Sequence, residues 1–241
     1  ENEALLRISG GDARKLLNAL ELVVNNNASS EIVITNQLVK TIIQQNLATY
    51  DKKGEMHYDI ISAFIKSMRG SDPNAAVYWL ARMIDGGEDP LFIARRMLIF
   101  ASEDIGNANP NALLLANTCF DAVNKIGYPE CRIILSQTAV YLATSAKSNS
   151  TYRAIGNALE MVRRTGDLSV PLHIRNAPTK LMKDIGYGAD YKYAHDYQGN
   201  FVDQEFLPNE IKGTKFYEPG DNPKERETRK FLVDRWKKYG Y

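Results

Sequence analysis

The chain has 241 residues, of which 44% are hydrophobic and 24% charged, and its 30 basic residues nearly balance 29 acidic ones for a net charge of +1. This length can bury a substantial core, and the balanced charge excludes a global field as the basis of nucleic-acid or membrane binding. No apolar run approaches the roughly 20 residues of a membrane-spanning helix, so we expect no membrane partner.

The first residues lack an initiator Met and enter a helical pattern at once, as we expect of a fragment of a longer protein. Residues 10–12 (Gly-Gly-Asp) then lead into a helix that carries Arg14 and an apolar stripe. A guanidinium in a first helical turn opposes the helix dipole, yet it is well placed to meet a phosphate. On spacing alone, Arg14 is either such an anion ligand or a surface side chain lying over the stripe.

Residues 31–34 (Glu-Ile-Val-Ile) are β-branched and too few for a helix. They predict either a small strand or an extended lead-in to a helix that Thr35 caps.

Four Asp-Pro or Asn-Pro pairs predict helix starts, because an acceptor at the N-cap precedes a proline with a suitable φ. These pairs are Asp72-Pro73, Asp89-Pro90, Asn109-Pro110 and Asn222-Pro223. Glycines at 86, 87, 106, 127 and 166 predict helix ends. Apolar residues between these marks recur with helical spacing, and further helices are predicted at about 110–126, 130–144 and 150–164. The pattern indicates a nearly all-α array of short-looped helices.

After Gly166 the periodicity weakens, and residues 167–222 predict ordered irregular structure with short helices. A last amphipathic helix follows Pro223, with Phe231, Leu232 and Trp236 as its expected apolar side.

Chemical motifs are scarce in this chain. There is no phosphate-binding glycine loop of the G-x-x-x-x-G-K-[ST] type, and no histidine has metal-ligand spacing, so we expect no metal and no catalytic site. Adjacent His195 and Asp196 rarely point at one another and make a poor acid–base pair. Cys119 and Cys131 lie in apolar helical sequence and are expected to be buried thiols in a reducing compartment.

Two charged groups leave alternatives open. Arg95 and Arg96, with Glu103 and Asp104 about two turns later, form either a structural ion network or a ligand site. The stretch 173–217 interleaves cations with eight aromatics. It is either a single-stranded DNA groove or a surface layer held by its aromatics, since nearby acids dilute its charge. The DNA-binding candidates in it are Arg175, Lys180 and Lys183.

Seven sequence blocks point to a known family. They are SGGDAR at 9–14, YDIISA at 58–63, KSMRGSDP at 66–73, YWLARM at 78–83, ARR at 94–96, ASEDIGNA at 101–108 and RNAPTKLMK at 175–183. The first resembles the sensor-2 helix in the lid of AAA+ ATPases of the clamp-loader group. Together the blocks resemble the replication-associated recombination protein A family (RarA, also called MgsA) and its eukaryotic Werner-helicase-interacting relatives, over essentially the whole chain.

The resemblance implies an all-α fold with a lid remnant at 1–50, a clamp-loader-like helical collar for oligomerisation at 51–165, and a family-specific C-terminal layer at 166–241. It makes Arg14 the sensor-2 arginine, which touches nucleotide phosphates. The family's P-loop and Walker B elements lie before the lid, so ATP and Mg²⁺ belong to the parent protein, and this fragment is expected neither to bind ATP stably nor to hydrolyse it.

The parent is implied to be a cytoplasmic, DNA-dependent ATPase that maintains replication forks and acts in recombination and repair. Its implied partners are further copies of itself in a homotetramer, single-stranded or forked DNA, and single-stranded-DNA-binding protein. The alternative function is a free-standing helical module that binds single-stranded DNA.

Overall fold

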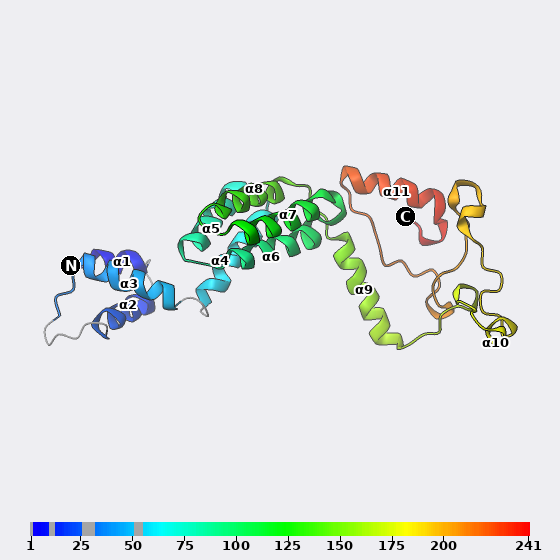
Figure 1. Ribbon diagram of the computed structural model, residues 1–241, viewed down its shortest axis with the longest axis horizontal. Coiled ribbons are helices and arrows are strands. Elements are labelled where there is room, and N and C mark those ends of the chain that lie inside the picture. The colour runs from blue at the N-terminus through cyan, green and yellow to red at the C-terminus, as the bar shows by residue number, and fades with distance from the viewer. Residues whose placement is uncertain (1, 10–12, 26–31, 51–54) are drawn as a thin grey trace. The chain divides into compact units, whose positions relative to one another are not determined.

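The computed structural model describes residues 2–9, 13–25, 32–50 and 55–241, and these form eleven α-helices and several shorter turns without any strand (Figure 1). The predicted all-α class is confirmed. The chain divides into two compact units, one of residues 1–95 with 122–143 and the other of residues 96–121 with 144–241. The division runs through the sixth and seventh helices, so these helices contribute to both units.

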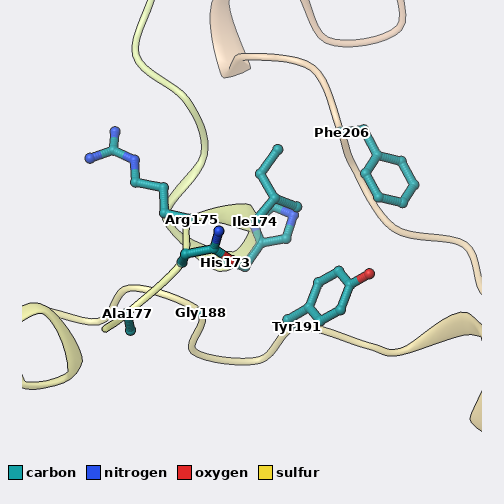
Figure 2. A pocket seen from close by; sticks show the side chains of 8 residues that line it. His173, Ile174, Arg175, Ala177, Gly188, Tyr191 and Phe206 are labelled. Atoms are coloured by element: carbon teal, nitrogen blue, oxygen red, sulfur yellow. The ribbon is translucent and has the colours of Figure 1, made fainter. Parts of the chain in front are cut away.

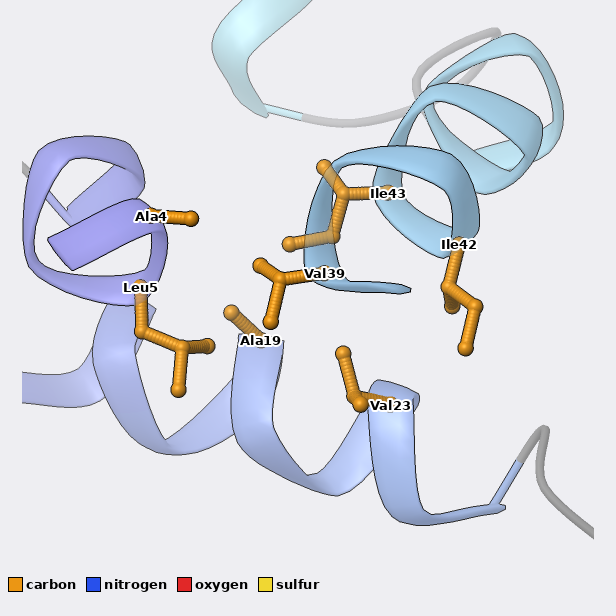
Figure 3. Packing of buried hydrophobic residues seen from close by; sticks show 7 residues of the cluster. All are labelled: Ala4, Leu5, Ala19, Val23, Val39, Ile42 and Ile43. Carbon is orange, nitrogen blue, oxygen red and sulfur yellow. The ribbon is translucent and has the colours of Figure 1, made fainter. Parts of the chain in front are cut away.

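The first three helices enclose a small core of their own (Figure 3). They are α1 (Glu3–Ser9), α2 (Ala13–Asn25) and α3 (Asn36–Tyr50). The core residues are Ala4, Leu5, Ala19, Val23, Val39, Ile42 and Ile43. Thr35 caps α3 as predicted, because its Oγ1 accepts a hydrogen bond from the Leu38 N–H at 3.1 Å. Residues 32–35 form no strand, which leaves the second alternative, a lead-in to α3.

Helix α4 (Glu55–Arg69) packs against α5 (Pro73–Asp85). The side chains of Phe64 and Met68 are completely buried, and Leu80 is nearly so. Asp72 caps α5 as predicted, since its Oδ1 accepts from the N–H groups of Asn74 and Ala75 at 3.0 Å each.

Three further helices begin within one residue of their predicted starts. They are α6 (Pro90–Phe100), α7 (Asn111–Ile126) and α8 (Cys131–Thr144). Asp89 caps α6 through the Leu91 and Phe92 N–H groups. The side chain of Asn109 donates to Ser145 Oγ at 3.2 Å, and α7 begins one residue after Pro110. Cys119 and Cys131 are buried free thiols, as predicted.

Helix α6 ends in a π-helical turn, Ala101–Ile105, followed by a 3₁₀ turn, Gly106–Ala108. Gly106 has φ 48°, and a Cβ there would lie 3.1 Å from the Ser148 carbonyl oxygen. Only glycine suits both the backbone and the space. The loop before α9 therefore packs directly on this turn, and the Ser148 N–H donates to the Asp104 carbonyl at 2.8 Å.

The remainder holds α9 (Ser150–Thr165), the short α10 (Lys180–Asp184) and α11 (Pro223–Arg235), with irregular segments between them, as predicted. The expected apolar side of α11 is wrong in two respects. Phe231 is 53% exposed, with the Arg235 guanidinium 3.7 Å above its ring, and Trp236 follows the helix end. The residue that α11 buries is Glu225, and Phe231, six positions later, lies on a different face of the helix.

Candidate functional site

A buried carboxylate lies at the start of α11. Glu225 is 0% exposed and accepts hydrogen bonds from Ser150 Oγ, Asn222 Nδ2 and, at 3.3 Å, the Tyr217 hydroxyl. Asn222 in turn caps α11 by accepting from the Glu225 N–H at 3.0 Å. This reciprocal pairing is a variant of the capping box in which Glu225 accepts from the Asn222 side-chain amide in place of the backbone N–H.

The carboxylate of Glu225 also meets a second helix, since Ser150 is the first residue of α9. Helix N-termini favour negative charge, and here it lies in the first turn of α11 beside the first residue of α9. Burial alone raises a carboxyl pKa. Hydrogen bonds from Ser148, Ser150, Asn222 and the Gly220 N–H outweigh it and hold the pKa of Glu225 below its ordinary value. Glu225 therefore stays ionised at neutral pH.

The 3₁₀ turn Gly106–Ala108 contacts both α9 and α11. The Asn107 side chain hydrogen-bonds Tyr217, whose pKa is raised mainly by burial and further by the charge of Glu225. We call Asn107, Ser148, Ser150, Tyr217, Asn222 and Glu225 the polar junction. It fastens the C-terminal layer to the turn that the ASEDIGNA block forms.

Two members of the charged group singled out in the sequence, Arg95 and Asp104, each have a charged neighbour outside that group. Arg95 pairs with Asp89, Nη2 to Oδ2, at 3.3 Å, and both side chains are 51% exposed, so the pair contributes little. Asp104 lies near Lys147. Burial lowers the pKa of Lys147, and the charge of Asp104 partly offsets that effect.

Within the described part of the chain, no cluster of His, Cys, Asp and Glu could hold a metal ion. None of the helices described there is long and apolar enough to cross a membrane. His195 lies in a 3₁₀ turn with its ring 5.1 Å from that of Tyr193.

The three DNA-binding candidates are placed in two ways. Arg175 donates from Nε to the Val170 carbonyl at 2.6 Å and from Nη1 to the Tyr187 hydroxyl at 3.0 Å. Its guanidinium also lies 5.0 Å from the centre of the Tyr187 ring. Arg175 is thus engaged within the layer, whereas Lys180 and Lys183 are exposed on α10.

A cavity of about 470 Å³ opens beside Arg175 (Figure 2). Its lining residues are His173, Ile174, Arg175, Asn176, Ala177, Gly188, Tyr191 and Phe206. We call it the layer pocket.

Helix α9 carries an apolar stripe whose side chains are about half exposed. Tyr152, Ile155, Leu159 and Val162 are between 48% and 58% exposed. Their spacing of three, four and three residues places them on one side of the helix.

The helix that carries Arg14 is present, and α2 begins at Ala13, so Arg14 lies in its first turn as predicted. The side chain of Arg14 and the preceding residues 10–12 lie outside the described part of the structure.

Comparison with known proteins decides the family. Residues 70–236 match the family described as MgsA AAA+ ATPase C terminal, and residues 1–69 match the AAA C-terminal domain. The chain belongs to the MgsA AAA+ ATPase family. The resemblance inferred from the sequence blocks is confirmed.

Relatives of this MgsA-family chain span bacteria and a eukaryote. It is 44% identical to Replication-associated recombination protein A of Coxiella burnetii over 89% of the chain and 50% of the relative, and 44% identical to that of Escherichia coli K12 over 90% and 49%. It is 42% identical to ATPase WRNIP1 of Dictyostelium discoideum over 90% of the chain and 27% of that protein. The chain spans about half the length of the bacterial relatives.

Sequence reasoning missed Glu225, the completely buried carboxylate of this MgsA-family chain. The signal that could have found it was the Asn222-x-x-Glu225 spacing, which is a capping-box pattern directly after a predicted N-cap. Its contact with Ser150 has no sequence signal, because the two residues are 75 positions apart along the chain.

Proposed function

We propose that this chain provides the oligomerisation surface and the nucleotide-sensing lid of a DNA-dependent AAA+ ATPase. The ATPase acts in replication-fork maintenance, recombination and repair. The names of its relatives and the two adjoining family matches support this role. ATP and Mg²⁺ belong to the parent protein in this proposal, and the chain itself hydrolyses no ATP.

In this proposal, residues 1–50 are the lid, residues 51–165 the collar and residues 166–241 a layer that completes it. Arg14 is the sensor-2 arginine. Its place in the first turn of α2 supports this role, because the N–H groups at a helix start and a guanidinium both attract phosphate. The lid orientation then responds to the charge of the bound nucleotide.

The exposed stripe of α9 is the observation that carries the assembly role. Four large apolar side chains with heptad-like spacing form the seam of a helix–helix contact, and leaving them in water is unfavourable. Gly156 lies between Ile155 and Leu159, and the space around it is open, so a partner helix can approach closely. A homo-oligomer, with the tetramer expected from the family, buries this stripe.

Sedimentation velocity of the chain without nucleotide tests the assembly role. At micromolar concentration we expect a species heavier than the 27.1 kDa monomer. A single monomeric species across that range contradicts self-association.

The second candidate function is a single-stranded DNA-binding module, favoured by the half-exposed Tyr191 and Phe206 beside the layer pocket. In the first function, the parent protein is cytoplasmic, acts at replication forks and has single-stranded-DNA-binding protein as a partner.

A further inference from the structure

The turn at Gly188 forms one wall of the layer pocket. The Gly188 N–H donates to the Leu172 carbonyl at 2.9 Å, which holds this turn against residues 172–175. Gly188 has φ 71°, and a Cβ there would lie 3.3 Å from the Arg175 carbonyl oxygen. A larger residue would therefore have to displace that wall. Arg175 itself is fixed by Val170 and Tyr187, so this wall of the pocket is held by several independent contacts.

Two sets of hydrogen bonds place the aromatic side chains at the rim. Gln204 and the Lys192 backbone bond to each other in both directions, at 3.3 and 3.2 Å, which ties the residue after Tyr191 to the segment before Phe206. His173 Nε2 donates to the Glu205 carbonyl at 2.6 Å, and this bond joins the His173 part of the pocket lining to the segment before Phe206.

The side chain of Glu205 then fixes the backbone at Phe206. Its Oε1 accepts from the Phe206 and Leu207 N–H groups at 3.0 Å each, while Oε2 pairs with Lys238 at 3.1 Å. Despite this fixed backbone, Tyr191 and Phe206 remain 49% and 44% exposed. The aromatic surface is thus held in place and left open to solvent.

The lining of the pocket suits a flat ring with a polar edge. Tyr191 and Phe206 offer aromatic surface for stacking, and the Asn176 carboxamide offers both donors and an acceptor. Unpaired bases are bound in this way, by aromatic stacking and by hydrogen bonds to their edges. The cavity volume of about 470 Å³ lies within the range of small-ligand sites, about 300–1,000 Å³.

The charges around the pocket favour a base over a run of phosphates as the main contact. Lys180, Lys183 and Lys192 are exposed nearby in sequence, but Asp184 and Asp190 accompany them. A ligand held mainly by phosphates needs a cationic groove, which this balance does not provide. Stacking between an aromatic side chain and a base does not depend on this balance of lysine and aspartate charges.

We propose that the layer pocket binds an unpaired base of single-stranded DNA, stacked on Tyr191 and Phe206 with its edge at Asn176. This inference rests on the proposed association with DNA and assigns it to a particular site. With Arg175 in the lining and three lysines nearby in sequence, the logarithm of the affinity should fall with the logarithm of salt concentration with a slope no steeper than about −3.

Fluorescence anisotropy with a labelled single strand of about 16 nucleotides tests the site on the whole 241-residue chain. Tyr191→Ala should weaken binding about tenfold or more, because stacking on one aromatic side chain is lost. Tyr191→Phe keeps the ring and should bind like the unaltered chain. Tyr197→Ala is the matched control, since Tyr197 is an exposed tyrosine of the same layer that does not line the pocket.

A strand of the same length with abasic sites separates base from phosphate contacts. It should bind more weakly than the normal strand, and Tyr191→Ala should not weaken it further. Equal affinity of the Tyr191→Ala and unaltered chains for the normal strand overturns the inference, and so does no binding at low salt. Sedimentation of the same samples reports self-association separately, so the pocket can fail while the assembly role stands.

Discussion

Glu225 at the start of α11 accepts a hydrogen bond from Ser150 at the start of α9 and is completely buried. The two residues are 75 positions apart in the chain. A buried charge held by neutral donors is stabilising only while every donor stays in place, because an uncompensated buried charge costs several kcal/mol (about 3–5). The polar junction therefore keeps α9, α11 and the ASEDIGNA turn in a single arrangement.

Replacing Glu225 with Gln should lower the free energy of unfolding by about 1–3 kcal/mol, because a buried amide NH₂ would face groups that donate hydrogen bonds. Glu227→Gln is the matched control. Glu227 lies on the same helix and pairs with Lys224, with side chains 70% and 60% exposed, so its loss should change stability by less than about 0.5 kcal/mol. Urea unfolding monitored by circular dichroism measures the free energy of unfolding of both variants. Equal stability of the two variants would show that the junction contributes nothing.

The same carboxylate makes stability depend on pH. Its folded-state pKa lies below the ordinary value of 4.5, so its contribution is fully present above that pH and is lost as pH falls through the lower folded value. Glu205, with its pKa lowered by hydrogen bonds that outweigh burial, acts in the same direction. Unfolding at a series of pH values below 4.5 should show a shallower loss for Glu225→Gln than for the unaltered chain. Parallel curves contradict the assignment of this titration to Glu225.

The α9 stripe is expected to be the self-association surface. Leu159→Glu places a charge in the middle of the apolar seam and should shift the chain to monomer at micromolar concentration, because burying an unpaired carboxylate is costly. Asn157→Glu adds the same charge to an exposed position of α9 outside the stripe and should leave assembly unchanged. Sedimentation velocity distinguishes them. Assembly that survives Leu159→Glu would place the interface elsewhere.

Arg14 is expected to act only in the intact ATPase. There, Arg14→Ala should lower the rate of ATP turnover about tenfold or more, because a positioned cation beside the transferring phosphate is lost. Arg7→Ala removes an exposed arginine from the last turn of α1 and serves as the control. Steady-state ATPase assays give the comparison, and unchanged turnover for Arg14→Ala removes it from the nucleotide site.

Local patterns predicted the helices well because helix starts and ends are local events. Asp72 and Asp89 cap the helices that the sequence places after them, since each carboxylate reaches N–H groups two or three residues away. The apolar side of α11 could not be predicted in this way. Its amphipathic pattern does not reveal that Phe231 stays exposed beneath the Arg235 guanidinium. Nor does it reveal that Trp236 packs on Phe201, with ring centres 5.2 Å apart.

The candidate site residues also differ in how much of their setting the sequence predicted. The place of Arg14 in the first turn of a helix was predicted from the sequence, whereas the engagement of Arg175 with Val170 and Tyr187 was not.

By itself, the sequence determined the all-α class, the helix boundaries, the buried thiols and the family, because each depends on neighbouring residues or on ordered blocks of them. Only the tertiary structure decided that Ser150, Tyr217 and Glu225 meet, and that Tyr191 and Phe206 share the rim of one pocket. The physical reason is that a hydrogen bond or a stacked ring has the same strength whatever the sequence separation of its partners. Which distant residues become partners is settled by the packing of the whole layer.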